Sequence, residues 1–240
     1  MRKKTIVIFR SVGKIANNEL ENMLLKKNFE VLTFPILSIV NINSKPISTS
    51  KTQAVLLTSS NGLYYFSKLS DDKLIKIFTV GSSTKKLALE LGYKNVIDCN
   101  GDSVKMFNIV IDNTLKENGK LIFVGAKDIS VDMPRMLKRI GYEVERYVVY
   151  KTKEFQVMDK KFINLIKCGK IDWIVLLSNK GAANFYRLSK KYLNLSLLSN
   201  IKFAFLSKNI ASELPESIMY KFFPRKPSLN NLKNIILKKE

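Results

Sequence analysis

The sequence predicts an α/β protein in which two similar parallel-sheet domains, the first of them discontinuous, are joined by a two-stranded β connection. Three observations predict this architecture. Short apolar runs, typical of strands buried on both faces of a parallel sheet, alternate with segments of helical apolar spacing. The phrase Val-Leu-Leu-Thr-Ser-Ser-Asn-Gly at 55–62 returns 119 residues later as Ile-Val-Leu-Leu-Ser-Asn-Lys-Gly at 174–181. Between the two copies lies a strongly extended segment, 146–152.

The strand segments are short, apolar and rich in β-branched residues. Pro35 begins an extended stretch, 36–40, that leads into the turn-rich segment 41–46, where we expect the chain to leave its first domain. The predicted strands are residues 5–9, 29–34, 36–40, 54–57, 76–80, 95–97, 120–124, 146–152, 172–177, 201–206 and 218–223.

The helices are predicted from apolar residues three or four apart and from signals at their ends. Gly92 and Gly141 suit positions just after a helix, Pro134 suits a first turn, and Ser228 suits an N-cap. The predicted helices include residues 19–27, 63–69, 87–91, 104–115, 134–140, 161–167, 185–188, a short one reaching Leu214, and 229–236.

Small hydroxyl residues and glycine follow several of the predicted strands. Carboxyl ends of parallel strands meet at one sheet edge, and the helix N-termini beside them offer N–H groups to anions. The same residues also suit plain N-caps, and Thr84 in particular is expected to serve partly as one. The loops in question are 58–62, 81–84, 178–181 and 207–209.

Composition sets the limits on function. The 240 residues, 46% of them hydrophobic, can bury one large core or two small ones. The net charge of +21 and a pI of about 9.9 favour an anionic partner, whether nucleic acid, acidic membrane or a small polyanion. The basic residues are 34 Lys against 7 Arg, and the chain is rich in Asn and Ile, so AT-rich coding explains the charge equally well.

Several kinds of chemistry are excluded by what the chain lacks. There is no histidine, which removes Ser-His-Asp and Cys-His catalysis and histidine metal sites. Cys99 and Cys168 stand far apart, which suits a reducing compartment and two buried thiols. The apolar run 6–9 after the basic start is stopped by Arg10, too short for a signal peptide, and no stretch approaches a membrane span. We therefore expect a cytoplasmic protein without a membrane span.

An ordered set of short motifs resembles the uroporphyrinogen-III synthase family over nearly the whole chain. The family pattern begins with an Arg after the first strand, a Phe-Thr-Ser strand end and a Val-Gly-x-x-Thr loop. A Val-Tyr-x-Thr strand follows, and then come second copies of the Phe-Thr-Ser and Val-Gly-x-x-Thr loops. The matching segments here are Arg10, Leu-Thr-Ser at 57–59, Val-Gly-Ser-Ser-Thr at 80–84, Val-Tyr-Lys-Thr at 149–152, Leu-Ser at 177–178 and Leu-Ser-Lys-Asn-Ile at 206–210. The last segment has Ser207 where the pattern has Gly, so side-chain contacts of that loop are in doubt.

The resemblance implies a fold and a reaction. Domain 1 would comprise residues 1–36 and 153–240, and domain 2 residues 37–152 including the connecting strands at both ends. The reaction would close the linear tetrapyrrole hydroxymethylbilane to uroporphyrinogen III. Hydroxide leaves ring A to give an azafulvene, ring D attacks through its substituted carbon, and a spiro intermediate recloses with ring D inverted. No metal or cofactor is needed, and a monomer with transient contact to hydroxymethylbilane synthase is expected.

The resemblance also implies a site. Tyr150 would donate a proton to the leaving oxygen, although a strand tyrosine packed between domains is the plainer interpretation. The substrate is a polycarboxylate, so its other contacts should recognise anions. Lys202 is equally well explained as a solvated lysine at a strand edge. The predicted substrate-binding residues are Arg10, Thr58, Ser59, Ser60, Gly81, Ser82, Ser83, Thr84, Ser178, Asn179, Lys202 and Ser207.

Two other classes of function compete with this interpretation. A bilobal anion-binding protein without catalysis would share the fold, but neither a GxGxxG after a strand nor a GxxxxGK[ST] is present. A nucleic-acid binder would share the charge, but no recognised motif appears and the lysines are scattered over the chain. We therefore expect a small-molecule polycarboxylate partner and no nucleic acid.

Overall fold

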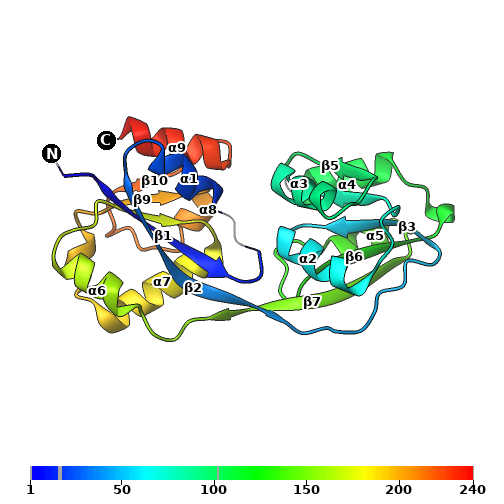
Figure 1. The fold of residues 1–240 in the computed structure, drawn as a ribbon, viewed down its shortest axis with the longest axis horizontal. Coiled ribbons are helices and arrows are strands. Elements are labelled where there is room, and N and C mark those ends of the chain that lie inside the picture. Colours follow the sequence, from blue (N-terminus) through cyan, green and yellow to red (C-terminus); the bar gives the residue numbers. More distant parts are fainter. Residues whose placement is uncertain (1, 16–17, 102, 240) are drawn as a thin grey trace. The chain divides into compact units, whose positions relative to one another are not determined.

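Parallel strands and helices alternate along the chain in the computed structural model, which describes residues 2–15, 18–101 and 103–239 (Figure 1). The pairs β1–β2, β1–β8, β3–β6 and β8–β9 are all parallel. A mixed α/β fold built on a largely parallel sheet confirms the predicted fold class.

The chain divides into two compact units. Unit 1 comprises Met1–Val12, Ala16–Ser38 and Lys153–Glu240, and unit 2 comprises Gly13–Ile15 and Ile39–Thr152. Each unit has helices on both faces of its sheet.

In unit 1 the strand order is β10-β9-β8-β1-β2. Helices α1 and α9 pack on one face, and α6, α7 and α8 pack on the other. The strands are β1 (Thr5–Val12), β2 (Glu30–Asn41), β8 (Trp173–Leu176), β9 (Lys202–Phe205) and β10 (Lys221–Phe222). The helices are α1 (Glu19–Leu25), α6 (Lys160–Lys167), α7 (Asn179–Tyr192), α8 (Lys208–Ala211) and α9 (Leu229–Lys238), with a 3-10 turn η2 (Leu195–Leu198).

In unit 2 the strand order is β7-β6-β3-β4-β5. Helices α2 and α3 pack on one face, and α4 and α5 on the other. The strands are β3 (Thr52–Leu57), β4 (Ile77–Thr79), β5 (Val96–Asp98), β6 (Lys120–Ala126) and β7 (Val144–Glu154). The helices are α2 (Ser60–Leu69), α3 (Ser82–Glu90), α4 (Ser103–Asp112) and α5 (Met133–Arg139), with a 3-10 turn η1 (Lys116–Asn118).

The central strands are apolar on both faces because each face has its own core. Ile6 and Ile8 enter the core under α1 and α9, while Val7 and Phe9 enter the core under α6 and α7. Successive strand residues point to opposite faces, so a run without polar positions fits only a strand covered on both sides. This is why the apolar runs located the strands of both units.

β2 and β7 each contribute residues to both units. Their partners are local to each unit: the N–H of Phe155 donates to the carbonyl of Ile36 in unit 1, and the N–H of Ile42 donates to the carbonyl of Val149 in unit 2. These two strands carry the chain out of unit 1 and back.

β2 runs through Pro35, which stands opposite Arg10 where the register of β1 shifts. A proline lacks an N–H donor, and an irregular register removes the need for one. Cys99 is buried as expected, but Cys168 is exposed. No described helix is both long and apolar enough to cross a membrane.

Candidate active site

Tyr150, within β7, and Ser59, just after β3, meet in unit 2. The phenol oxygen of Tyr150, in β7, lies 3.0 Å from Oγ of Ser59, which follows β3. Ser59 is also the N-cap of α2, because its Oγ accepts the N–H of Gly62 at 3.1 Å. One serine therefore caps a helix and holds the tyrosine.

Burial controls the protonation of this phenol. Tyr150 is 8% exposed and its ring stacks on Tyr65, with centroids 6.1 Å apart. Burial raises the pKa of Tyr150 above the usual 10.0 because the phenolate is the form that loses hydration, and the hydrogen bond from Ser59 lowers it in part. The hydroxyl is therefore protonated at neutral pH and can donate.

A cavity of about 230 Å³ opens beside this pair, entirely within unit 2. Its wall includes Thr58, Ser59 and Tyr150 together with the segment that follows β6. Drug-sized ligands usually need about 300 Å³ or more, so a space of this size receives part of a larger molecule. The remaining lining residues are Val80, Ser103, Phe123, Ala126, Asp128, Ile129, Ser130 and Val131.

A second hydroxyl pair joins the neighbouring loop to the first. Oγ of Ser60 lies 3.2 Å from Oγ1 of Thr84, which is buried. Thr84 is not an N-cap, which corrects that expectation: Gly81 caps α3 and the side chain of Thr84 points back to the α2 loop. The loops after β3 and β4 are thereby held side by side.

The other predicted residues of this loop lie at the start of α3. Ser82 and Ser83 are exposed, and their backbone N–H groups belong to the first helical turn, which has no intrahelical acceptors. Gly81 has an extended backbone with φ −149°, and a Cβ there would meet no atom within 4 Å. This helix start is open to an approaching anion.

The repeated phrase builds the same cap in unit 1. Oγ of Ser178 accepts the N–H of Gly181 at 3.1 Å, as Ser59 does from Gly62 in unit 2. The Nδ2 group of Asn179 donates to the carbonyl of Asn209 at 3.0 Å and to Oε1 of Glu213 at 2.9 Å, which ties the loops after β8 and β9 together. Ser178 and Asn179 therefore share the carboxyl edge of the unit 1 sheet.

Arg10 and Ser207 also lie at that edge, with different surroundings. Arg10 lies two residues before the end of β1 and is partly buried. It hydrogen-bonds Oδ1 of Asn18 and lies 3.6 Å from a carboxylate oxygen of Glu21. Ser207 precedes α8 and makes no side-chain cap. Because α8 has four residues, the loop that departs from the family pattern begins only a single helical turn.

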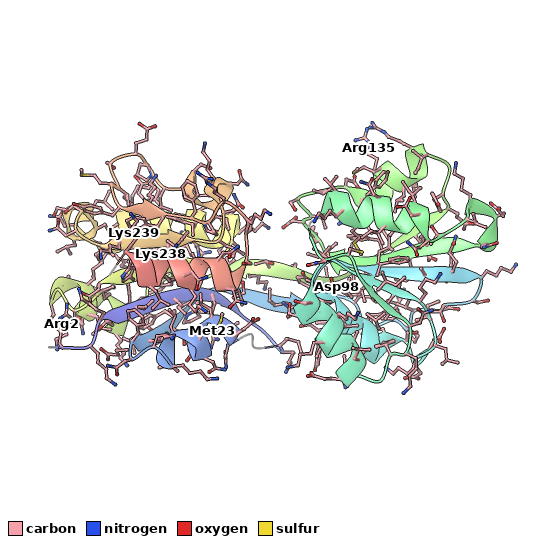
Figure 2. All side chains as sticks on the ribbon, turned by 90° about the horizontal axis from the view of Figure 1, so that it is seen from above. Arg2, Met23, Asp98, Arg135, Lys238 and Lys239 are labelled. Atoms are coloured by element: carbon pink, nitrogen blue, oxygen red, sulfur yellow. The ribbon has the colours of Figure 1, made fainter. Side chains whose placement is uncertain are left out.

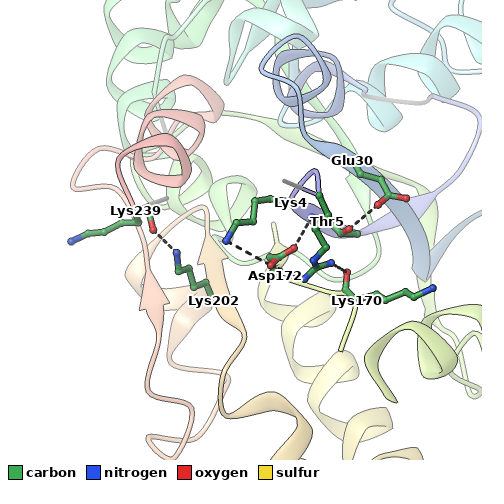
Figure 3. Close-up of polar contacts among 8 residues, drawn as sticks. Lys4, Thr5, Glu30, Lys170, Asp172, Lys202 and Lys239 are labelled. Carbon is green, nitrogen blue, oxygen red and sulfur yellow. Dashed lines mark hydrogen bonds and ion pairs between the residues drawn. The ribbon is translucent and has the colours of Figure 1, made fainter. Parts of the chain in front are cut away.

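Lys202 is the one predicted residue that the structure separates from the others of its unit. It begins β9, so it lies at the amino edge of the sheet, whereas Arg10, Ser178 and Ser207 lie at the carboxyl edge. Its ammonium group donates to the carbonyl of Lys239 (Figure 3). The same group lies 5.3 Å from the centre of the Trp173 ring. Lys202 therefore has no place beside the other predicted residues of unit 1.

Some cavity residues were missed by the sequence reasoning. Asp128, Ser130 and Ser103 line the cavity, yet none was predicted. Asp128 directly follows β6, so the rule that selected Thr58 and Ser59 after β3 also points to it. Ser103, at the start of α4, has no comparable signal because its strand and loop are short.

The fold and this pocket define a class of protein: an α/β protein that offers a buried phenol and helix N-termini at its strand ends to an anionic ligand. A family model described as uroporphyrinogen-III synthase HemD matches residues 18–232. The chain belongs to the uroporphyrinogen-III synthase family. Arg10 lies before the matched residues. No curated protein matches the chain significantly.

Solved structures support the fold. The crystal structure of uroporphyrinogen-III synthetase from Helicobacter pylori 26695 is 15% identical in sequence, with 100% of both chains covered and a TM-score of 0.65. A mutant uroporphyrinogen III synthase from the extremely thermophilic bacterium Thermus thermophilus is 15% identical, with 98% of this chain and 100% of that chain covered and a TM-score of 0.53. At such identities the likeness concerns the fold.

Membership of the family confirms the predicted class of activity. The chain is a cyclising lyase of tetrapyrrole (haem) biosynthesis, of the family that closes hydroxymethylbilane to uroporphyrinogen III with loss of water and inversion of ring D.

Proposed function

We propose that this chain closes hydroxymethylbilane with the phenol of Tyr150 as the proton donor to the departing hydroxyl. The observation that carries the proposal is the 3.0 Å pairing of Tyr150 with Ser59 in the wall of the unit 2 cavity. Loss of hydroxide from ring A needs a proton, and a buried phenol is protonated at neutral pH. A positioned general acid contributes about 10²- to 10⁴-fold to a rate.

Ser59 is proposed to orient that proton. The N–H of Gly62 occupies one acceptor position of Oγ, which leaves the serine its own proton and one further acceptor position. When a substrate oxygen arrives, Ser59 can donate to the phenol oxygen, and the phenol proton then points to the substrate. Ser59 is a positioning residue in this role as well as an N-cap.

The acetate and propionate groups of the substrate are proposed to bind at the helix starts. Thr58, Ser59 and Ser60 precede or begin α2, and Gly81 to Thr84 begin α3, so their N–H groups and helix dipoles favour carboxylates. Ser178, Asn179 and Arg10 provide the corresponding groups in unit 1. The cavity would receive the reacting end of the substrate and leave the other rings outside.

The remaining assignments follow the family pattern. We assign domain 1 to residues 1–36 and 153–240 and domain 2 to residues 37–152, which lie close to the two compact units. We further propose a cytoplasmic monomer that meets hydroxymethylbilane synthase transiently. Chemistry supports the transient contact. Hydroxymethylbilane closes readily to the uninverted isomer without catalysis, so a short time in free solution favours the type III product.

The test is a coupled assay in which hydroxymethylbilane is generated enzymatically and the isomers of the product are separated. The proposal requires the type III isomer in the presence of this chain and the type I isomer in its absence. Binding of hydroxymethylbilane without type III product would instead identify an anion-binding protein. Type III product from the Tyr150→Phe variant at the unaltered rate would remove the phenol from the mechanism.

A further inference from the structure

Four basic side chains line an open groove of about 500 Å³ on unit 2. Arg135, Lys138 and Arg139 come from α5 and Arg146 comes from β7, and all four are exposed. The buried face of α5 consists of Met133, Pro134 and Leu137, so its basic residues point away from the core. Figure 2 shows the side chain of Arg135 extending outward from its helix.

These cations are not neutralised by the protein. Within the described residues, none of the four has a carboxylate oxygen within 4.0 Å. Asp132 is the single acidic residue of the lining, and one of its oxygens accepts the N–H of Arg135 as the cap of α5. The groove therefore carries a net positive charge and can bind an anionic partner.

Neither the helix dipole nor coding bias accounts for this set of basic residues. Lys138 and Arg139 lie in the last turn of α5, where the helix dipole favours cations, but Arg135 lies in the first turn, where the dipole disfavours them. Arg135 is also a like-charge neighbour of both Lys138 and Arg139 along the helix, which destabilises it. Coding bias enriches lysine, yet three of the seven arginines of the chain line this groove.

A basic cluster at the amino edge of the unit 1 sheet differs from this groove, because a carboxylate lies within the cluster. There Asp172 lies 3.1 Å from Arg2 and 3.9 Å from Lys4, and it accepts the N–H of Thr5 at 2.8 Å (Figure 3). These basic residues therefore have an ion-pair partner within their own unit. The α5 groove has no such counterpart among the described residues.

We propose that the α5 groove, lined by Arg135, Lys138, Arg139 and Arg146, docks an acidic peptide segment of a partner protein. The planar fork of a guanidinium matches a carboxylate through two hydrogen bonds, which a lysine cannot provide. The groove is open and its basic residues are exposed, whereas a small-molecule site encloses most of its ligand.

The lining also distinguishes a peptide from a nucleic acid. No aromatic ring is among the lining residues, so the groove offers bases nothing to stack on. The carboxylate of Asp132 would repel a continuous row of phosphates, but a peptide can present a backbone N–H at that point. An acidic peptide can pair its carboxylates with the four basic side chains and a backbone N–H with the carboxylate of Asp132.

The docked segment would lie beside the catalytic unit without forming part of its cavity. Arg146 donates to the carbonyls of Ala126 and Lys127 at 3.1 and 2.7 Å, at the start of the loop that lines the cavity. The groove and the cavity share no lining residue. The proposal for the groove therefore does not depend on the role given to Tyr150.

The experiment measures fluorescence anisotropy of a labelled hexaglutamate peptide with the full chain at low ionic strength. We expect saturable binding that the double variant Arg135→Ala with Arg139→Ala weakens about tenfold, which is ~1.4 kcal/mol and within the range that two exposed ion pairs provide. Arg135→Lys with Arg139→Lys, which keeps the charge and removes the fork, should give an intermediate loss.

The matched control is Arg225→Ala with Lys226→Ala, an exposed pair in unit 1 that removes the same charge. This variant should bind the peptide as the wild type does. Equal weakening in both double alanine variants would assign the binding to net charge and overturn the proposal, as would wild-type protein that leaves the peptide free. A single-stranded oligonucleotide of equal charge that binds more tightly through the same arginines would also overturn it.

Discussion

The hydroxyl oxygens of Tyr150 and Ser59 lie 3.0 Å apart, and the same serine oxygen accepts the N–H of Gly62. The phenol is therefore fixed to a helix cap, and the cap is fixed to the end of β3. The proposed proton donation and the N-cap of α2 therefore share one side chain.

Replacing Tyr150 with Phe should lower kcat by about 10²-fold or more, because the variant lacks the proton for the leaving oxygen. The measurement is the rate of type III isomer formation in the coupled assay. Tyr147→Phe is the matched control, since Tyr147 lies on the same strand and donates to Glu145 outside the cavity. Similar rates for the two variants would contradict the assignment.

Replacing Ser59 and Ser178 separately with Ala should distinguish capping from catalysis. Each change removes an N-cap, and each should lower the free energy of unfolding by about 1 kcal/mol. Only Ser59→Ala also removes a partner of Tyr150 and should lower kcat strongly. Chemical denaturation and the isomer assay on both variants check this, and an equal fall in kcat would show that the serine acts through stability alone.

The alkaline side of the activity profile should reflect Tyr150. Burial raises the pKa of this group above 10.0, so its acidic form persists through the neutral range, and activity should fall only above about pH 10. The hydrogen bond with Ser59 lowers the pKa, so Ser59→Ala should move the fall to higher pH. Profiles of kcat/KM for both proteins test this, and a fall below about pH 9 in the wild type would assign the limb to another group.

Alanine at the two repeated glycines should destabilise the protein, although Gly→Ala inside a helix usually gains about 1 kcal/mol. A Cβ at Gly181 would stand 2.9 Å from Oγ of Ser178, and one at Gly62 would stand 3.1 Å from the carbonyl oxygen of Val124. We expect losses of about 1–3 kcal/mol in urea unfolding. Gly81→Ala is the steric reference, because a Cβ there meets open space and the change loses only the N-cap preference for glycine over alanine.

Much of the fold could be predicted because buried parallel strands leave a plain signal. Residues 5–9 and 54–57 are apolar at every or nearly every position, which only a doubly covered strand requires. Pro35 fits within β2 because the irregular register opposite Arg10 removes the need for a proline N–H, which the sequence of β2 alone does not reveal.

The site was less predictable, since its contacts join distant segments. The repeat and the strand-end rule located Ser59 and Ser178, and the resemblance to the Val-Tyr-x-Thr strand located Tyr150. The pairing of Thr84 with Ser60, by contrast, depends on how two loops are placed in three dimensions. Lys202 was selected by charge, although it begins its strand rather than following it. Residues before and after a parallel strand lie at opposite sheet edges, and charge carries no information about which edge a residue occupies.

The discontinuity of unit 1 has a consequence for biosynthesis. Its strand β1 needs β8 as a neighbour, and β8 leaves the ribosome more than a hundred residues later. All strands of the unit 2 sheet, in contrast, come from the part of unit 2 between Ile39 and Thr152. Chains fold from completed segments as they are made. The inserted unit should thus fold first. Until the remainder of its own sheet is translated, the amino-terminal segment of β1, α1 and β2 has an unpaired strand edge to which chaperones can bind.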